Sequence, residues 1–207
     1  MKTNITLLFL LVALQLCAQS DTDTLINQRD SLGLRQGKWI FFEEDYERLY
    51  GEFAEIHMDF LNDTIHGKYK VYDVNGVLRF DYQLIKGLRV GPAYEYYRSG
   101  KIYRIYYHVA DREAYTLEFN NKGYLFDEYM QKEDKLIGAH KTYKKGKLYI
   151  LRNYDDDNQL NGQFIYYYKN GQERHVLLFE NGTAISQKRY TRSGKLEYDS
   201  DSPKKQW

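Results

Sequence analysis

Hydrophobic and polar residues alternate along several stretches of the chain. Between residues 54 and 60 every second residue is apolar, and the residues between them are Glu55, His57 and Asp59. Strict alternation over several residues is typical of a β-strand with one buried face. We therefore predict a long amphipathic strand here. The competing helical interpretation of residues 47–60 is weaker because Gly51 interrupts it.

One short pattern recurs through the chain at a nearly constant spacing. Three copies read GKYKVYDVNG (67–76), GPAYEYYRSG (91–100) and GQFIYYYKNG (162–171). The first glycine of the pattern recurs at Gly67, Gly91, Gly138 and Gly162, and the second at Gly76, Gly100, Gly123, Gly146, Gly171 and Gly194. The steps between successive second glycines are 24, 23, 23, 25 and 23 residues. Such a period indicates a repeated structural unit, in which these glycines have structural roles.

Two aromatic positions and a tight turn characterise each unit. An aromatic residue often lies two residues after the first glycine and another five after it, as at Tyr69 and Tyr72. The second glycine usually ends an Asn-Gly, Ser-Gly or Lys-Gly pair, and glycine favours a hairpin turn because it accepts positive φ. Each unit therefore predicts one β-hairpin. An odd spacing puts the two aromatics on opposite faces of a regular strand, so either a bulge realigns them or both faces carry aromatics.

These units predict an all-β fold: an elongated antiparallel sheet of about six to seven tandem hairpins, each repeat 23–24 residues long. Hairpins in series bury their aromatic faces against one another, as in other repeat arrays. We assign residues 37–198 to the array, 19–36 to a polar leader and 199–207 to a C-terminal tail. Exposed edge strands at either end could pair between two copies and form a homodimer.

The N-terminus has the features of a signal peptide. Lys2 precedes an apolar run from Ile5 to Leu16, which is too short to span a bilayer comfortably, and Ala18 supplies a small residue for cleavage. We therefore expect residues 1–18 to be removed and the protein to be secreted or periplasmic. Cys17 opens an alternative, an outer-membrane lipoprotein acylated at this thiol, although Leu16 stands where a small residue is expected.

Charge and cysteine content narrow the classes of partner. The chain has 30 basic and 29 acidic residues, and loss of Lys2 with the signal peptide would leave 29 of each. Proteins that bind nucleic acid or anionic membranes by long-range attraction are usually basic. We therefore expect no nucleic-acid partner, and a membrane partner only if Cys17 is lipidated. Since Cys17 is the only cysteine, the mature chain would have neither a disulfide nor a cysteine nucleophile.

The repeated unit resembles a known family. The pattern G-x-[WYF]-x-x-[YF]-x-x-x-G-x-[LI] in GKYKVYDVNGVL, GPAYEYYRSGKI and GQFIYYYKNGQE resembles the MORN repeat. It is more closely similar to bacterial MORN-repeat-variant proteins, some of them described as antitoxin-like. The likeness covers Gly37 to Tyr198. It implies an elongated sheet of hairpins and a role in binding or scaffolding without a known active site, and it assigns no functional residue.

The sequence contains no recognisable catalytic or metal motif. It has no glycine-rich phosphate loop, P-loop lysine or metalloprotease helix. The histidines show no short-range pair of ligands, so we expect no metal and no cofactor; they are His57, His66, His108, His140 and His175. Asp155, Asp156 and Asp157 lack the spacing of a calcium loop and should form a solvated connector that caps turns. A carboxylate pair for glycan hydrolysis need not be close in sequence.

The tyrosines are the remaining candidates for function. Most aromatic residues should form the core and the cross-strand pairs of the sheet. Six tyrosines outside the framework positions could stand on an open face and bind sugars or proteins by stacking and hydrogen bonding. They are Tyr94, Tyr97, Tyr103, Tyr107, Tyr166 and Tyr168.

The leading hypothesis is an exported, non-enzymatic scaffold that binds a protein or a cell-envelope polymer. One alternative is a glycan-processing enzyme that uses carboxylates on the sheet. The other is a lipid-binding module of the MORN type that associates with the membrane surface.

Overall fold

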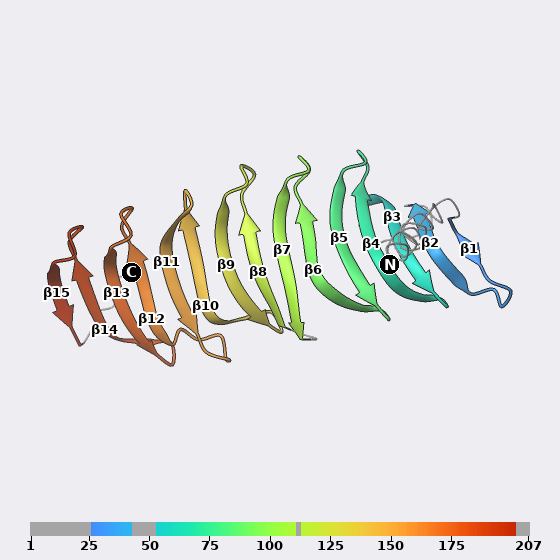
Figure 1. Cartoon of the computed structure of the whole chain (residues 1–207). Helices are drawn as coiled ribbons and strands as arrows, with labels where there is room; N and C mark the ends of the chain where they lie inside the picture. Colours follow the sequence, from blue (N-terminus) through green and yellow to red (C-terminus); the bar gives the residue numbers. More distant parts are fainter. Residues whose placement is uncertain (1–25, 43–52, 111–112, 202–207) are drawn as a thin grey trace, which may run out of the picture.

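The computed structural model describes residues 26–42, 53–110 and 113–201 and contains one long open sheet (Figure 1). Fifteen antiparallel strands pair strictly in chain order. The all-β elongated sheet expected from the sequence is therefore confirmed, with more strands than six to seven hairpins supply. The strands are β1 (Gln28–Arg29), β2 (Arg35–Phe42), β3 (Phe53–Leu61), β4 (Thr64–Asp73), β5 (Leu78–Ile85), β6 (Leu88–Tyr96), β7 (Ile102–Ala110), β8 (Glu113–Phe119), β9 (Leu125–Lys132), β10 (Lys135–Lys144), β11 (Lys147–Tyr154), β12 (Gly162–Tyr167), β13 (Glu173–Glu180), β14 (Thr183–Tyr190) and β15 (Leu196–Ser200).

The structure describes some of the segments predicted from the sequence and not others. The expected signal peptide, Cys17 and residues 202–207 of the expected tail lie outside them. The strand predicted from the alternation at 54–60 is β3, which excludes a helix over Phe53–Leu61. The strands also reach past the expected array, since β1 lies within the polar leader and β15 ends at Ser200.

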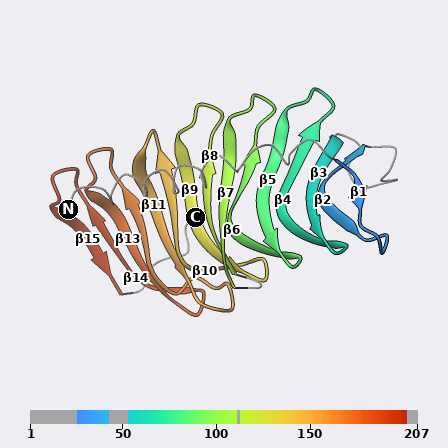
Figure 2. The same ribbon diagram turned by 45° about the vertical axis from the view of Figure 1, so that its right-hand side comes forward.

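The sheet is a single layer along its whole described length. Two views show the strands lying side by side from β1 to β15, each curved along its length (Figures 1 and 2). A bulge recurs three residues after most of the turn glycines, for example at Tyr103, where Glu95 pairs with Arg104 but Tyr96 pairs with Ile102. Bulges increase the local bend and twist of a strand, which accounts for a curvature that repeats from hairpin to hairpin.

The turns after the even-numbered strands are built by local hydrogen bonds. In the turn after β4, the Gly76 amide donates to the Asp73 carbonyl at 2.8 Å, and the Asp73 carboxylate accepts from the amides of Asn75 and Val77 at 2.9 and 3.1 Å. Gly76 has φ of +72°, which only glycine adopts without strain. Asp155 caps its own turn in the same way, as expected for the acidic connector.

Both faces of the sheet carry aromatic rings, which answers the question of the odd spacing. Directly paired residues of an antiparallel pair share a face, and successive residues alternate. Tyr69 pairs with Met58 and Tyr82, whereas Tyr72 pairs with Glu55 and Leu78 on the other face. The bulge lies after the turn and not between the two aromatics.

Burial is concentrated on the face that carries Arg104, which we call the Arg104 face; the other is the Tyr107 face. All buried residues of the described part except Ile165 lie on the Arg104 face. They are Met58, Phe60, Val71, Asp73, Leu84, Ala93, Thr116, Glu118, Ile150, Leu177 and Phe179. With no second layer, these side chains are covered by their neighbours in adjacent hairpins, so each repeat depends on the next for its burial.

Candidate functional site

One row of paired residues crosses the Arg104 face from β2 to β15, and we call it the central row. Each member pairs directly with the next one. Its members are Phe41, Ile56, Val71, Phe80, Glu95, Arg104, Glu118, Asp127, Thr142, Ile150, Tyr166, His175, Arg189 and Tyr198. The row is apolar from β2 to β5 and then becomes charged in the middle of the sheet. This change of chemistry at one repeat position marks the candidate site.

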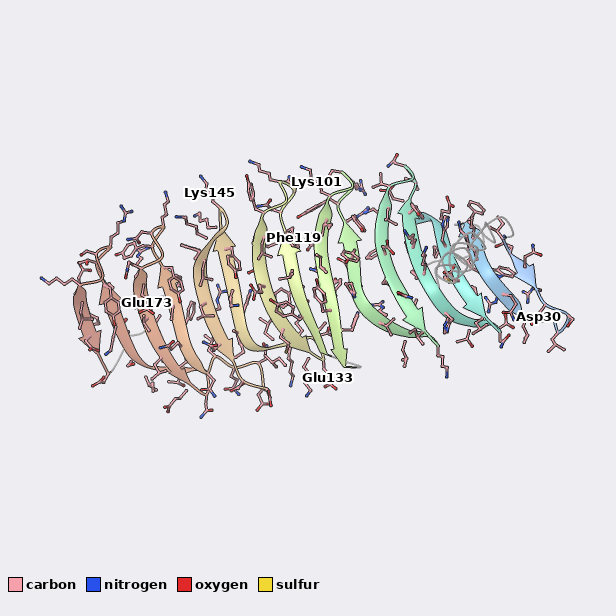
Figure 3. The ribbon with its side chains drawn as sticks, in the orientation of Figure 1. Asp30, Lys101, Phe119, Glu133, Lys145 and Glu173 are labelled. Carbon is pink, nitrogen blue, oxygen red and sulfur yellow. The ribbon has the colours of Figure 1, made fainter. Side chains whose placement is uncertain are left out.

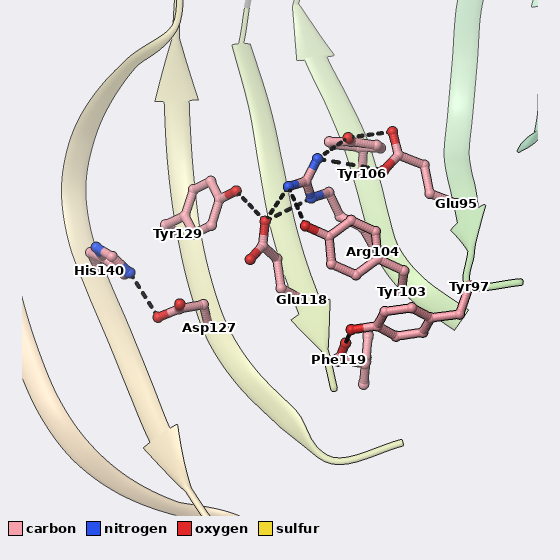
Figure 4. Close-up of polar contacts among 10 residues, drawn as sticks. All are labelled: Glu95, Tyr97, Tyr103, Arg104, Tyr106, Glu118, Phe119, Asp127, Tyr129 and His140. Carbon is pink, nitrogen blue, oxygen red and sulfur yellow. Dashed lines mark hydrogen bonds and ion pairs between the residues drawn. The ribbon is translucent and has the colours of Figure 1, made fainter. Parts of the chain in front are cut away.

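Arg104 joins two carboxylates in the middle of the row (Figure 4). Its Nε donates to Glu118 Oε1 at 2.7 Å, its Nη2 lies 2.6 Å from the same oxygen, and its Nη1 lies 3.4 Å from Glu95 Oε2. Nη1 also donates to the Tyr106 hydroxyl at 2.6 Å, and Nη2 to the Tyr103 hydroxyl at 3.0 Å. The guanidinium is therefore held by groups from β6, β7 and β8.

Tyrosine hydroxyls also donate hydrogen bonds to both carboxylates. Tyr106 donates to Glu95 Oε1 at 2.6 Å, and Tyr129 donates to Glu118 Oε1 at 2.8 Å. Burial and the bond to Glu95 raise the pKa of Tyr106 to about 12. Burial alone would lower the pKa of Arg104, but its bonds to Tyr106 and Glu118 outweigh that effect and hold the pKa above its ordinary value. At neutral pH the cluster therefore contains a charged Arg104 and a neutral Tyr106.

The network extends towards β10 through Asp127. Glu118 and Asp127 are direct cross-strand partners, and two like charges in such a pair repel each other. The two carboxylates contact partners on opposite sides. Glu118 accepts from Arg104 on β7, whereas Asp127 faces β10: His140 Nε2 lies 2.9 Å from Asp127 Oδ1, and the Thr142 hydroxyl donates to the same oxygen at 2.8 Å. The repulsion is thus offset by separate partners.

Beside this network the Arg104 face has a hollow of about 160 Å³ that spans β3 to β7. Its walls include the rings of Tyr69, Tyr82 and Tyr106, together with Arg89 and Glu95. Tyr69 and Tyr82 stack at 4.5 Å between centroids, and the Arg89 guanidinium lies 4.6 Å from the centre of the Tyr82 ring. Apolar ring surface beside a few polar groups is the usual composition of a binding pocket.

The Tyr107 face has a polar cluster of its own around Glu128. This carboxylate accepts from Lys141 Nζ and from the Tyr143 hydroxyl, both at 2.6 Å. Burial alone would raise the pKa of Glu128, but hydrogen bonds from Lys141, Tyr143 and Tyr115 outweigh it and hold the pKa below its ordinary value. Burial and Glu128 together raise the pKa of Tyr115 to about 12. Lys141 balances the charge of Glu128, so this cluster ties β8, β9 and β10 together.

The structure does not bring the six candidate tyrosines together on one surface. Tyr94 and Tyr107 lie on the Tyr107 face, where Tyr107 is 40% exposed. Tyr103 is at a bulge and holds Arg104, and Tyr166 belongs to the central row. The remaining two, Tyr97 and Tyr168, lie at turns.

Tyr97 and Tyr168 connect neighbouring hairpins. The Tyr97 hydroxyl donates to the Phe119 carbonyl at 2.8 Å, and the Tyr168 hydroxyl donates to the Tyr190 carbonyl at 2.9 Å. In both cases the acceptor lies 22 residues further on, at the end of the first strand of the next hairpin. The extra tyrosines thus include structural links between repeats.

The described residues do not group histidines, cysteines or carboxylates into a cluster of three that could hold a metal ion. His140 and His57 each contact a single carboxylate, Asp127 and Glu55 respectively. Within the same part of the chain, no helix has the length and apolarity required to cross a membrane.

The charged part of the central row was missed by reasoning from sequence. A signal was present, because the fifth residue before the turn glycine is Val71 in one repeat, Glu95 in the next and Glu118 in the third. Arg104 and Asp127 likewise take the repeat position of Phe80, four residues after that glycine. Aligning the copies on the turn glycine would have revealed charge at an otherwise apolar position.

Comparison of the sequence with models of known protein families found no match, and comparison with curated proteins found none. The likeness to MORN repeats rests on the spacing of the glycines and aromatics and stays a prediction.

Proposed function

We propose that this protein is an exported, non-enzymatic scaffold that binds another protein or a cell-envelope polymer through its Arg104 face. The observation that carries the proposal is the hollow walled by Tyr69, Tyr82 and Tyr106, with Arg89 and Glu95 at its side. Tyrosine offers apolar ring surface and a polar hydroxyl together, which suits recognition of sugars and peptides. An open single-layer sheet lets an extended partner reach several hairpins at once.

The state of the carboxylates supports a role in binding over one in catalysis. Glycan hydrolysis needs one carboxyl that can donate a proton and a second that acts as a base or nucleophile. Glu95 and Glu118 are bridged by Arg104 and accept hydrogen bonds from Tyr106 and Tyr129. Both oxygens of Glu95 and Oε1 of Glu118 are therefore engaged within the protein.

Site-specific photo-crosslinking tests the binding face. A photoreactive amino acid placed at Arg89, on the Arg104 face, should capture an envelope component. The same group at Gln83, on the Tyr107 face of β5, should not. Both residues are exposed, so the comparison controls for accessibility. Equal capture at the two positions, or capture at Gln83 alone, would refute the assignment of the face.

A glycan-processing enzyme remains the second candidate because Glu95 on β6 and Glu118 on β8 lie on one face, on either side of Arg104 on β7. Incubation of the protein with envelope polysaccharides, followed by measurement of new reducing ends, separates the two functions. We expect no release. Release that disappears in Glu118→Gln would establish the enzyme and overturn the scaffold.

Export is tested at the native N-terminus. Mass spectrometry should find Gln19, free or cyclised to pyroglutamate, as the first residue. A lipid on Cys17 would show an anchored protein instead, and an intact Met1 would remove the basis for an envelope partner.

A further inference from the structure

The connectors on one edge of the sheet are basic. In a meander every second connector lies on the same edge, and the described ones here are residues 74–77, 97–101, 120–124, 145–146, 168–172 and 191–195. They contain no acidic residue, and their cations are Arg98, Lys101, Lys122, Lys145, Lys169, Arg192 and Lys195. Figure 3 shows Lys101 and Lys145 on this basic edge. Residues 43–52, which join β2 and β3 and are acidic in sequence, lie outside the described residues.

The opposite edge is acidic. Its described connectors between β3 and β14 carry Lys86 as their one cation, and their acidic residues are Asp63, Glu133, Asp134, Asp155, Asp156 and Asp157. Figure 3 shows Glu133 on this edge. The formal net charge of +1 therefore conceals two edges of opposite sign, and partners excluded by the net charge must be reconsidered for the basic edge.

The basic edge contains a hollow of about 460 Å³ between β10 and the turn before β15. Six exposed cations line it: Lys144, Lys145, Lys147, Lys169, Arg174 and Arg192. None of the six forms an ion pair with another described residue. Glu173 precedes Arg174 in the sequence but does not line the hollow. The lining contains no carboxylate, so a bound anion would meet only positive charge.

Two tyrosines of this hollow contact three of its six cations. The Arg174 and Arg192 guanidinium groups lie 5.9 and 6.0 Å from the centre of the Tyr168 ring, and Lys144 Nζ lies 5.2 Å from that of Tyr149. Cations in contact with aromatic rings lose part of their freedom before any ligand arrives. The same contacts occupy the rings of Tyr149 and Tyr168, so a nucleic-acid base would have to displace a cation in order to stack on either of them.

We infer that this hollow and the basic edge around it bind a linear acidic polysaccharide. Successive turns on one edge are two strands apart, about 9.5 Å, so a chain with regularly spaced negative groups would meet cations at each hairpin from β6 to β15. A flat bilayer would touch the turn tips but not the interior of the hollow. The inference rests on the proposed function for its choice of an envelope polymer, and it adds a second binding surface on the edge, separate from the Arg104 face.

The test measures binding of the purified mature chain to alginate oligosaccharides, which carry a carboxylate on every sugar, with neutral dextran as the control polymer. Binding should be specific to alginate and should weaken as salt is raised from low to physiological concentration, because ion contacts are screened. Lys145→Gln combined with Lys169→Gln should lower the affinity for alginate by roughly tenfold and reduce its salt dependence.

A matched variant controls for charge and turn geometry. Lys86→Gln combined with Lys135→Gln removes the same charge from exposed residues on the acidic edge. Lys86 and Lys145 also share a conformation, with φ of 51° and 56° and a glycine next in the chain. This control variant should bind alginate within about twofold of the unmodified protein, and both variants should unfold at the same temperature as it does.

Three results would overturn the inference: equal loss of alginate binding in both variants, no binding to alginate at all, or tighter binding to oligo(dT) or to phosphatidylglycerol vesicles. Crosslinking at Arg89 reports on the Arg104 face independently. If that crosslinking succeeds while alginate fails to bind, the proposed scaffold stands and only the polysaccharide site falls.

Discussion

Replacement of Arg104 by methionine should destabilise the middle of the sheet. The substitution keeps most of the aliphatic stem but removes the charge that joins Glu95 to Glu118. Loss of one partner from a fully buried ion pair costs about 3–5 kcal/mol, whereas exposed pairs contribute about 0–1 kcal/mol. The Glu118 and Glu95 side chains are 11% and 21% exposed, and that of Arg104 is 24% exposed. We therefore expect a loss of about 2–3 kcal/mol in the free energy of unfolding.

Urea unfolding followed by aromatic fluorescence measures this loss, and hydrogen exchange shows whether it is centred on β6 to β8. A double-mutant cycle with Glu118→Gln isolates the pair, with an expected coupling of about 1–2 kcal/mol. Arg189→Met is the matched control. Arg189 is exposed and lies in the same central row, and its guanidinium carbon lies 5.7 Å from the centre of the Tyr198 ring. Its replacement should cost less than about 0.5 kcal/mol.

Two results would refute this reasoning. If Arg104→Met costs no more than Arg189→Met, the network does not hold the hairpins together. If the coupling with Glu118 is near zero, Arg104 does not satisfy that carboxylate in solution. Either result would leave Glu118 available for chemistry and would favour the glycan-processing enzyme over the scaffold.

Four further substitutions test other parts of the fold. Gly67→Ala should lower the free energy of unfolding by over about 3 kcal/mol, because φ is +128° and a Cβ would lie 2.6 Å from Asp59 Oδ2. Gly76 has open space around it, so Gly76→Ala should lower it by about 1 kcal/mol. Urea unfolding measures both. Tyr97→Phe removes the link to the next hairpin and should lower the unfolding free energy by about 1 kcal/mol. Tyr106, with its pKa raised to about 12, should stabilise the fold fully below about pH 10 and lose this contribution as the pH rises to about 12. Compared with the unmodified protein, Tyr106→Phe should lack one tyrosine's share of the phenolate absorbance at 295 nm that appears in that range.

The fold was predictable because its signals are local. Turn glycines at a nearly constant step and alternating apolar residues each depend on a few neighbouring positions, and together they gave an antiparallel sheet of hairpins. β1 was missed because two exposed residues, Gln28 and Arg29, carry no pattern. They form a strand only because β2 offers its edge.

The candidate site was less predictable because it depends on register. The sequence alone did not show that Glu95, Arg104 and Glu118 are consecutive members of one cross-strand row, since a bulge shifts the pairing in both hairpins that contain them. The sequence does show Tyr97 and Tyr168 as extra aromatics outside the framework positions of the repeat. Their link to a carbonyl 22 residues away appears only once neighbouring hairpins are placed side by side.

A single-layer sheet separates the demands of stability from those of binding. Burial here comes from neighbouring hairpins, so a buried charged network needs hairpins on both sides, and the Arg104 cluster indeed lies in the middle of the sheet. The connectors contribute little to that burial and are free to vary in charge as long as each keeps its turn residue. Opposite charge on the two edges therefore costs little in folding stability, and the basic edge can acquire a ligand without disturbing the central row. By the same reasoning, substitutions at Lys145 and Lys169 should change the affinity for alginate while leaving stability unchanged. Substitutions at Arg104 should lower stability while leaving the affinity for alginate unchanged.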